Sequence, residues 1–585
     1  MNVRILLALC WLAFYTAPSG ADAAPGAGKA DFLLINARIY TEQHWAPWAH
    51  ALAVAGERII YVGEPHGAEW DALIGPKTRA YDLHNCLVLP GIIDSHTHPG
   101  LVTLSAWHTI LPWTMNPDEQ LGYLKKWAAE HPDRPIIDAE LYPTQMFGAA
   151  GPTRQLIDRY IPDRAVIWED FSGHSVALNS RALALMGIDK HTPDPVPGTS
   201  LFVRDANGNP TGWAKEDPYS VYLPKLFKAV NWSPPTTVTA QTFGKTLDFL
   251  SAHGVTAVFD GFSSEDEFQA LATLEHARAL HLYYEGSLRF ETLAELPAKI
   301  AVIRDWQHRY GSKHVRINTL KLFLDGTNEL STSALLEPFA NNPNNSGAPV
   351  LNKVDLVESL LLLNRENMDI HIHMTGDRSF RLALDAVEEA RKQLGSQWRM
   401  QVTFAHCELI SDQDMPRVAP LGVLINWTPH WSGGYFQGPQ ETLGMQRYDN
   451  MYRFQPIIAS GGIVTFGSDT TTLYEWSRAD PFIGMQIAHT RFDVEPRYQA
   501  YGVRKPLSEM LQLPDLVRGY TINGAIQLRR AADMGSIETG KLANIVVLNQ
   551  DLFEVQADKI QFTAPTAVIF EGQIVQGSLQ ARPGH

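Results

Sequence analysis

The sequence predicts an α/β protein: a (β/α)8 TIM barrel with a composite N-/C-terminal β-sandwich and a large insertion after strand one. Three observations lead to this prediction. Eight β-branched or aromatic runs alternate with helical patterns through the middle of the 585-residue chain. Both ends of the chain contain short strand-like runs, and a long gap separates the first two barrel runs. A chain of this length can bury a core of that size.

The first 23 residues predict a secretory signal peptide. Arg4 supplies a positive start, residues 5–15 form an apolar core, and Ala21-Asp-Ala23 is a small-residue cleavage site. We therefore expect an exported protein, periplasmic or secreted. No later segment has the roughly 20 unbroken apolar residues that a membrane span requires, so no membrane span is expected.

The composition excludes some classes of partner. Hydrophobic residues make up 45% and charged residues 19%, which is typical of a globular protein. The formal net charge of -15 disfavours a nucleic-acid partner. Only Cys86 and Cys407 follow the predicted signal, too few for a disulfide scaffold. A small-molecule substrate is the expected partner, and the sequence leaves a homo-oligomer open.

Residues 24–88 and 535–585 are expected to form one composite β-sandwich domain, since neither end is large enough to fold alone. Gly56, Gly63 and Gly572 mark turns between the strand-like runs. The predicted strands are Phe32 to Tyr40, Ala51 to Val54, Arg58 to Val62, Ile545 to Leu548, Thr566 to Phe570 and Gln573 to Val575.

Residues 89–534 are expected to form the barrel, with helices such as Val354 to Asn367 and Phe380 to Leu394 between strands. The gap after the first strand is too long for one helix, so about residues 101–250 are predicted to be an insertion over the active site. The eight predicted strands are Leu87 to Asp94, Val255 to Phe259, Leu280 to Ser287, Arg316 to Phe323, Met368 to His373, Met400 to Ala405, Gly422 to Asn426 and Ile463 to Gly467.

Histidines and an aspartate follow several of these strands. In Pro90-Gly-Ile-Ile-Asp-Ser-His-Thr-His98, the period of two places His96 and His98 on the same side. Taken alone, the pair is better explained by two histidines packed in a turn. His373, His406 and Asp469, however, end strands five, six and eight. Because barrel enzymes place functional groups at these ends, the set predicts a metal site with zinc-type ligands.

The same residues belong to a wider set of motifs by which the chain resembles the amidohydrolase superfamily, in the amidohydrolase family 3 branch that includes N-substituted formamide deformylase. The resemblance covers most of the mature chain. Its motifs are Pro-Gly-Ile-Ile-Asp-Ser-His-Thr-His (90–98), Gly-His-Ser (173–175) with Asn179, Pro-Thr-Gly (210–212) before Glu216, Gly-Val-Thr (254–256), Lys321 with Asp325-Gly326, His373 with Gly376-Asp377, His406, Gly-Ser-Asp (467–469) and Gly-Ser-Ile-Glu-Thr-Gly-Lys-Leu-Ala (535–543).

The resemblance implies two divalent metal ions, most simply zinc. One would be held by His96, His98 and Asp469 and the other by His373 and His406. Lys321 would bridge them as a carboxylated lysine, because a lysine ammonium has no acceptor and cannot ligate a metal. The alternative for Lys321 is a strand lysine that extends its ammonium group toward solvent.

The expected reaction is hydrolysis of a carbon–nitrogen amide-type bond in an N-acyl or N-formyl amine. Metal ions at this site would activate a water and polarise the carbonyl, and Asp469 would act as general base and then acid. The resemblance suggests that His174 polarises or positions the substrate. Candidate substrate-binding residues are Glu216, Asp325, His430 and Trp427.

The expected substrate loops depart from the pattern of that branch. Thr327 to Ser333 replace a glycine-containing run, and Thr470-Thr471 follow Asp469. These loops leave the metal ligands intact and leave the acyl group open. The alternatives are therefore a lactone, ester or peptide-like acyl hydrolase on the same site, or a non-catalytic exported metal-binding protein.

Overall fold

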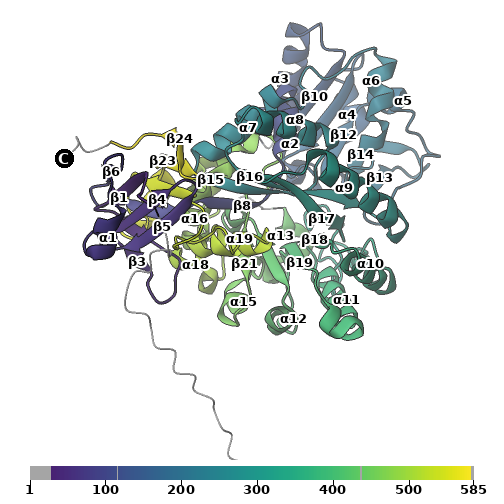
Figure 1. Ribbon diagram of the computed structural model, residues 1–585. Helices are drawn as coiled ribbons and strands as arrows, with labels where there is room; N and C mark the ends of the chain where they lie inside the picture. The colour runs from purple at the N-terminus through teal and green to yellow at the C-terminus, as the bar shows by residue number, and fades with distance from the viewer. Residues whose placement is uncertain (1–27, 115, 435–437, 581–585) are drawn as a thin grey trace, which may run out of the picture.

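A computed structural model describes residues 28–114, 116–434 and 438–580 (Figure 1). At its centre, eight parallel strands follow one another in chain order around a nearly closed barrel, which confirms the predicted fold class. All eight predicted barrel strands are present. They are β8 (Ile92–Thr97), β15 (Val255–Asp260), β16 (Tyr283–Phe290), β17 (Val315–Phe323), β18 (Asp369–Met374), β19 (Val402–His406), β20 (Leu424–Trp427) and β21 (Val464–Phe466).

Side-chain and loop hydrogen bonds close the barrel between its first and last strands. The Ser95 hydroxyl donates to the Phe466 carbonyl at 2.6 Å, and the Asp469 backbone N–H donates to the His96 carbonyl at 2.8 Å. The second bond fixes the loop after β21 directly against β8. It therefore brings two of the predicted metal-binding segments together.

Helices surround the barrel, and their first turns are capped as the sequence allows. Ser264 and Glu267 form a capping box at α8, and the Asn352 side chain accepts from the Asp355 N–H at α10. Phe380 on α11 packs edge-on against Phe404 of β19 in the core between helix and strand. The barrel helices are α2 (Pro99–Leu104), α7 (Ala240–Ala252), α8 (Glu265–His276), α9 (Leu296–Tyr310), α10 (Lys353–Arg365), α11 (Asp377–Leu394), α12 (Val418–Leu421), α13 (Pro439–Leu443), α14 (Met445–Asp449), α15 (Gln455–Ala459), α16 (Pro481–Thr490), α17 (Pro496–Gln499), α18 (Leu513–Gly519) and α19 (Ile522–Gln527).

A separate sheet occupies the chain between β8 and β15. Its strand order is β13-β14-β12-β11-β10-β9, with parallel pairing in β9–β11 and antiparallel pairing elsewhere. In Figure 1 this sheet and its helices lie at the upper right, beside the barrel. The elements are β9 (Thr109–Ile110), α3 (Pro117–Glu130), β10 (Ile136–Tyr142), α4 (Arg154–Asp158), β11 (Ala165–Asp170), β12 (Ser175–Leu178), α5 (Ser180–Met186), β13 (Leu201–Arg204), β14 (Pro210–Lys215) and α6 (Leu223–Ala229).

The two chain ends meet in a pair of sheets at the left of Figure 1. One sheet has the order β5-β4-β1-β6, and the other, β24-β23-β22-β7-β2-β3, joins the ends through antiparallel pairing of β22 with β7. The elements are β1 (Phe32–Ile35), β2 (Arg38–Tyr40), β3 (Trp48–Ala49), β4 (Ala51–Ala55), β5 (Arg58–Gly63), α1 (Ala68–Leu73), β6 (Arg79–Asp82), β7 (Leu87–Pro90), β22 (Ile545–Leu548), β23 (Pro565–Phe570) and β24 (Gln573–Gly577).

Two predicted strands are each divided in the structure. The run from Phe32 to Tyr40 breaks at Asn36, which has a positive φ of 49°, and its halves enter different sheets. The run from Leu87 to Asp94 breaks at Gly91 into β7 of the terminal sheet and β8 of the barrel. A Cβ at Gly91 would lie 2.2 Å from the Thr256 hydroxyl oxygen, so only glycine fits this crossing.

The predicted signal peptide lies outside the described residues, so export stays a prediction. Within the described ranges, none of the helices combines the length and apolarity that crossing a bilayer demands. The boundaries predicted for the domains likewise stay predictions.

Candidate metal centre

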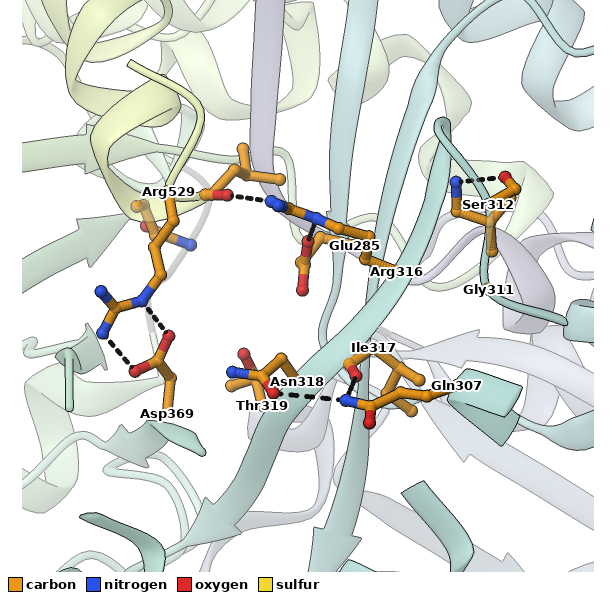
Figure 2. Close-up of a pocket in the computed structure, with 13 residues that line it drawn as sticks. Glu285, Gln307, Gly311, Ser312, Arg316, Ile317, Asn318, Thr319, Asp369 and Arg529 are labelled. Atoms are coloured by element: carbon orange, nitrogen blue, oxygen red, sulfur yellow. Dashed lines mark hydrogen bonds and ion pairs between the residues drawn. The ribbon is translucent and has the colours of Figure 1, made fainter. Parts of the chain in front are cut away.

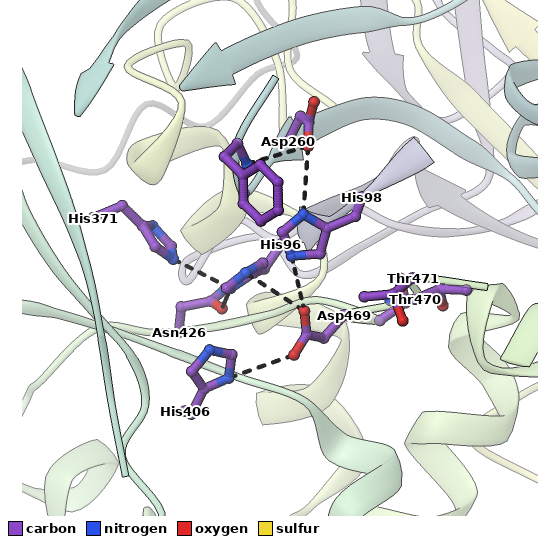
Figure 3. Close-up of polar contacts among 12 residues, drawn as sticks. His96, His98, Asp260, His371, His406, Asn426, Asp469, Thr470 and Thr471 are labelled. Atoms are coloured by element: carbon purple, nitrogen blue, oxygen red, sulfur yellow. Dashed lines mark hydrogen bonds and ion pairs between the residues drawn. The ribbon is translucent and has the colours of Figure 1, made fainter. Parts of the chain in front are cut away.

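Three predicted ligands converge where the barrel strands end. The side chains of His96, His98 and Asp469 each offer a ligand atom, and these atoms lie within 4.8 Å of one another. Asp469 Oδ1 lies 3.6 Å from His96 Nε2 and 3.2 Å from His98 Nε2. Figure 3 shows both imidazoles turned toward this carboxylate, with His406 approaching it from the other side. The arrangement provides nitrogen and oxygen donors around one point.

Backbone packing holds the two β8 histidines in place. His96 lies inside β8, and His98 follows its last residue. A Cβ on Gly261, which follows β15, would lie 2.3 Å from His98 Cε1 and 2.9 Å from His96 Nε2. A Cβ on Gly467 would lie 2.5 Å from the His96 backbone nitrogen. Glycine at both positions therefore lets neighbouring strands approach the histidines closely.

Two of the clustered residues have strained backbones. His406 has a φ of 70° and Asp469 a φ of 48°, in the left-handed region that favours glycine. Such conformations cost about 1–3 kcal/mol each and are concentrated at functional sites. His406 Nδ1 lies 3.6 Å from Asp469 Oδ2, so the strained backbone brings these two side chains together.

Buried imidazoles in the cluster are neutral and can offer lone pairs. Burial lowers the pKa of His96 and His373 well below the usual value, and that of His406 to about 3. A carboxylate among neutral imidazoles is the donor set that divalent metals bind.

The side-chain amide of Asn426, which the sequence analysis did not identify as a site residue, fixes the orientation of His96. The Asn426 side-chain oxygen lies 3.0 Å from His96 Nδ1, while its nitrogen donates to Ser95 Oγ at 2.9 Å and Thr465 Oγ1 at 3.0 Å. Because the Asn426 oxygen accepts from Nδ1, the Nε2 lone pair of His96 points toward Asp469. His371 places its Nε2 3.2 Å from His96 Nδ1 and stacks on Phe259.

A second unpredicted neighbour is Asp260 at the end of β15. Its Oδ1 lies 3.7 Å from His98 Nδ1, and its Oδ2 accepts from Ser263 and Tyr284 hydroxyls. Nothing in the local sequence distinguishes this aspartate from a strand-end aspartate in a turn.

Lys321 lies in the barrel interior, fully buried. Its Nζ is 3.1 Å from His96 Nε2, and among the described residues it forms no ion pair with a carboxylate. Burial lowers the pKa of Lys321 to about 7. The side chain therefore points into the cluster rather than toward solvent, contrary to the alternative of a solvent-directed strand lysine.

His373 lies beside His406. The two ring centroids are 4.5 Å apart, and His373 Nε2 is 3.4 Å from the Gly326 carbonyl oxygen. Trp431 stacks on His406 with ring centroids 5.2 Å apart. The structure thus brings all six predicted ligands into one neighbourhood, with His96, His98 and Asp469 in the tightest group.

His174 reaches this neighbourhood from the insertion sheet. Its ring centroid is 5.7 Å from that of His373, and its Nδ1 is 2.7 Å from Glu216 Oε2. Burial lowers the pKa of His174, but the Glu216 carboxylate more than reverses this and raises it to about 9. Glu216 Oε1 accepts hydrogen bonds from Thr327 and Thr332, so both oxygens of Glu216 are occupied.

The remaining predicted substrate residues have structural partners. Asp325 accepts from the backbone N–H groups of Ala334, Thr375 and Gly376. His430 is buried, with Nε2 3.3 Å from the Asp480 carbonyl oxygen. Trp427 packs against Phe454 and Phe466 in the hydrophobic core.

A cavity of about 470 Å³ lies at the opposite end of the barrel, where β17 and β18 begin (Figure 2). Its charged side chains are paired: Arg316 with Glu285 at 3.0 Å, and Arg529 with Asp369 at 2.5 Å. Barrel enzymes work at the other end of the strands, so this cavity is separate from the candidate metal centre.

The fold and the site together define a β/α-barrel protein with clustered metal-type ligands where its strands end. The family model of the amidohydrolase family matches residues 79–576, and the chain belongs to that family.

Individual proteins match most of this chain at low identity. The exoenzymes regulatory protein AepA of Pectobacterium carotovorum subsp. carotovorum is 28% identical over 74% of this chain and 92% of its own length. The N-substituted formamide deformylase of Arthrobacter pascens is 24% identical over 89% of this chain and 94% of its own. The structure of an uncharacterized metal-dependent hydrolase from Pyrococcus furiosus has a TM-score of 0.63 at 24% identity, over 89% of this chain and 100% of that one. That last similarity supports the fold.

Proposed function

We propose that this protein is a metal-dependent hydrolase that cleaves the carbon–nitrogen bond of an N-acyl or N-formyl amine. The proposal rests on one observation, the convergence of His96, His98, His406 and Asp469 beside the buried Lys321. Membership of the amidohydrolase family supports hydrolysis. The similarity to a formamide deformylase supports an amide-type bond.

The donor set fits divalent metal ions. His406 Nδ1 faces Asp469 and is buried without a hydrogen-bond partner among the described residues, and an unsatisfied buried nitrogen of this kind is costly unless something else binds it. His96, His98 and Asp469 would hold one ion, most simply zinc, and His373 and His406 a second. Carboxylated on Nζ, Lys321 would bridge them. Bound ions would supply water activation and polarisation of the scissile carbonyl.

Asp469 is the proposed proton carrier. Its carboxylate is held by imidazoles on both sides, so it can accept a proton from the attacking water and return it to the leaving nitrogen. An amine leaves readily only when its nitrogen is protonated, so this return of the proton makes cleavage of an amide possible.

His174 is the proposed substrate-orienting residue. The Glu216 carboxylate contacts Nδ1 of His174. Nε2 of His174 therefore stays available to bind the acyl oxygen of the substrate. We assign Glu216 and Asp325 to positioning rather than direct substrate binding, because their oxygens already accept hydrogen bonds from the loop after β17. His430 and Trp427 would support the wall of the site through its packing.

The deciding experiment measures metal content and turnover together. The purified protein, before and after chelation, is assayed on N-formyl, N-acetyl, aryl-amide, lactone and ester substrates. At least two metal ions per chain, with amide cleavage that chelation abolishes, is the expected result. Cleavage of only the lactone or ester substrates would show that the protein is a lactone or ester hydrolase instead. Metal content without any hydrolysis would support a metal-binding protein instead.

The matched variants are Asp469→Asn and Asp558→Asn, the latter an exposed carboxylate with 67% of its side chain accessible. Asp469→Asn is expected to reduce kcat by about 100-fold or more, the range of a lost general acid–base group. Asp558→Asn should change nothing. Wild-type turnover by metal-loaded Asp469→Asn would contradict the role of Asp469.

We also propose export through the N-terminal signal, based on Arg4, the apolar run after it and Ala21-Asp-Ala23. N-terminal sequencing of the protein from the extracytoplasmic fraction should begin at Ala24. A cytoplasmic protein that begins at Met1 would contradict export.

A further inference from the structure

The insertion sheet buries a second cluster of metal-type ligands, away from the barrel centre. His108 directly precedes β9, Asp138 and Glu140 lie on β10, and Glu169 lies on β11. Strand register explains their meeting: Glu140 pairs with Glu169 across β10 and β11, and the β9–β10 register sets His108 beside Asp138. Residues two apart share a face of a strand, so Asp138 and Glu140 point the same way.

The side chains of His108, Glu140 and Glu169 place ligand atoms within 4.8 Å of one another. His108 Nδ1 contacts Glu140 Oε1, and His108 Nε2 lies 3.7 Å from Asp138 Oδ2. The Tyr219 hydroxyl donates to Glu169 Oε1 at 3.1 Å. Imidazole and carboxylates from three adjacent strands thus surround one point.

The charges of this cluster are unbalanced. It contains three carboxyl groups and one imidazole, and within the described residues no lysine or arginine pairs with the three carboxylates. Like charges directly opposite each other on neighbouring strands destabilise a sheet, and burial makes uncompensated charge more costly still. A sheet that keeps Glu140 opposite Glu169 therefore needs a compensating positive charge.

Asp138 supplies an independent sign of a missing partner. Its side chain is 8% exposed, and its Oδ1 is buried without a hydrogen-bond partner. Its Oδ2 faces His108, so the carboxylate is directed into the cluster. Buried polar atoms in native proteins almost always have a partner.

We propose that His108, Glu140 and Glu169 bind a divalent transition-metal cation of the zinc or manganese class, with Asp138 against the other imidazole nitrogen of His108. Mixed imidazole and carboxylate ligands suit these ions. Ligand atoms around such an ion lie up to about 4.4 Å apart, twice a bond of about 2.2 Å, which is close to the 4.8 Å within which the ligand atoms of His108, Glu140 and Glu169 lie. The short contact between His108 and Glu140 would lengthen on binding. The ion would join β9, β10 and β11.

An ion at this place would also stabilise the turn that carries His174. Strand β11 ends at Asp170, whose carboxylate accepts from Ser172 and the Ser175 N–H in the turn that carries His174. Fixing β10 against β11 would therefore stabilise the turn that presents His174 to the barrel. This role is independent of which bond the barrel centre cleaves.

Proton sharing is the competing explanation for the cluster. Burial lowers the pKa of His108, but Asp138 and Glu140 raise it to about 10, and burial raises the pKa of Asp138 to about 6. Burial also raises the pKa of Glu169 well above its usual value. A charged imidazole and two protonated carboxyls could therefore balance the site without metal. The metal explanation predicts a bound ion that is lost when a carboxylate is neutralised. Proton sharing predicts no ion and a more stable protein after that change.

The test uses the full-length protein with His96→Asn, His98→Asn, His373→Asn and His406→Asn, which removes the histidine ligands of both proposed barrel ions. After chelation this parent is reloaded with zinc or manganese alone. We expect about one ion per chain and a higher melting temperature. Adding Asp138→Asn and Glu140→Gln should abolish both, whereas Glu130→Gln on α3, with 59% of its side chain exposed, should not.

The proposal is overturned if the parent binds no ion, or if the cluster variants retain the ion and the melting response. A rise in melting temperature for Glu140→Gln at unchanged metal content would establish proton sharing instead. The same cluster variants in the wild-type background should lose one ion per chain, which decides the question if the parent does not fold. Failure of the barrel centre to bind metal would leave wild type and parent with equal content, so the two proposals fail separately.

Discussion

At the scale of single residues, Gly261 is required for the close approach of His96 and His98. A Cβ there would lie 2.3 Å from His98 Cε1 and 2.9 Å from His96 Nε2. Gly261→Ala should therefore displace both imidazoles, destabilise the fold by about 1–3 kcal/mol through overpacking, and reduce bound metal. Elemental analysis and denaturant unfolding measure the two effects.

Gly122 on α3 is the matched control, because nothing lies within 4 Å of a Cβ built there. Gly122→Ala should keep the metal and stabilise the protein by up to about 1 kcal/mol. Full metal content in Gly261→Ala would show that the histidines do not need this close approach.

Asn426 is the second residue whose role can be tested alone. Asn426→Leu keeps the volume but leaves His96 Nδ1 and the Ser95 hydroxyl without their partner. Lost orientation of a metal ligand typically costs about 10–100-fold in metal affinity, which competition with a chelator would measure. Asn364→Leu removes comparable buried hydrogen bonds in α10, and should lower stability without changing metal affinity. Equal affinities in both variants would exclude the orienting role.

The sequence predicted those site residues whose side chains can bind a metal and whose positions end a predicted strand. His96, His98, His406 and Asp469 are ligand-type residues at predicted strand ends, and the structure brings them together. Asn426 ends a predicted strand too, but an amide there has no distinctive chemistry until its partner is known. That partner lies 330 residues earlier in the chain, so the local sequence contains no signal of the contact.

At the scale of secondary-structure elements, Glu216 connects the insertion sheet to the barrel. It follows β14, pairs with His174 at 2.7 Å, and accepts from Thr327 and Thr332 in the loop after β17. Glu216→Gln weakens a charge-assisted hydrogen bond worth about 1.5–3 kcal/mol. We expect a loss of about 10–100-fold in kcat/KM at unchanged metal content.

Glu130→Gln serves as the control for that variant, since Glu130 is exposed on the same insertion. The measurement compares the loss of activity in Glu216→Gln with its loss of bound metal. If Glu216→Gln lost metal in proportion to activity, Glu216 would support the metal centre rather than His174.

The hydrophobic pattern of the sequence does not predict where two of the strands are divided. The apolar run from Leu87 to Asp94 predicts one strand, yet Gly91 divides it between two sheets. Hydrophobicity reports that a segment is buried but not which neighbour it pairs with. The division at Asn36 has the same cause, because β1 and β2 are both buried strands with different partners.

At the scale of the whole molecule, the (β/α)8 barrel was predictable because its repeating pattern covers most of the chain. The pairing of the two chain ends was predictable only as a plausible union of two small β-rich segments. Its register, with Ile545 opposite Pro90, depends on contacts between residues more than 400 positions apart. Such contacts are set by tertiary packing rather than by local propensity.

The terminal sheets are held to the barrel by Glu571, which follows β23. Its Oε1 lies 2.8 Å from Lys313 Nζ and 3.2 Å from His314 Nε2, and it accepts from the Tyr283 hydroxyl of β16. Burial acts to raise the pKa of Glu571, but these three partners lower it from 4.5 to about 2. A carboxyl whose folded pKa is depressed contributes stability above its unfolded pKa. That stability is present above pH 4.5 and is lost as the pH falls toward 2.

Glu571→Gln should therefore lower the free energy of unfolding at pH 7 by about 1–2 kcal/mol, after allowance for solvent screening. The difference from wild type should shrink between pH 4.5 and 2, as measured by denaturant unfolding across that range. Glu57→Gln is the matched control, because Glu57 contacts the same Lys313 Nζ at 2.6 Å with 55% of its side chain exposed. A control effect equal to that of Glu571→Gln would mean that the link between sheet and barrel depends on Lys313 alone. A pH-independent difference would mean that Glu571 acts through packing rather than charge.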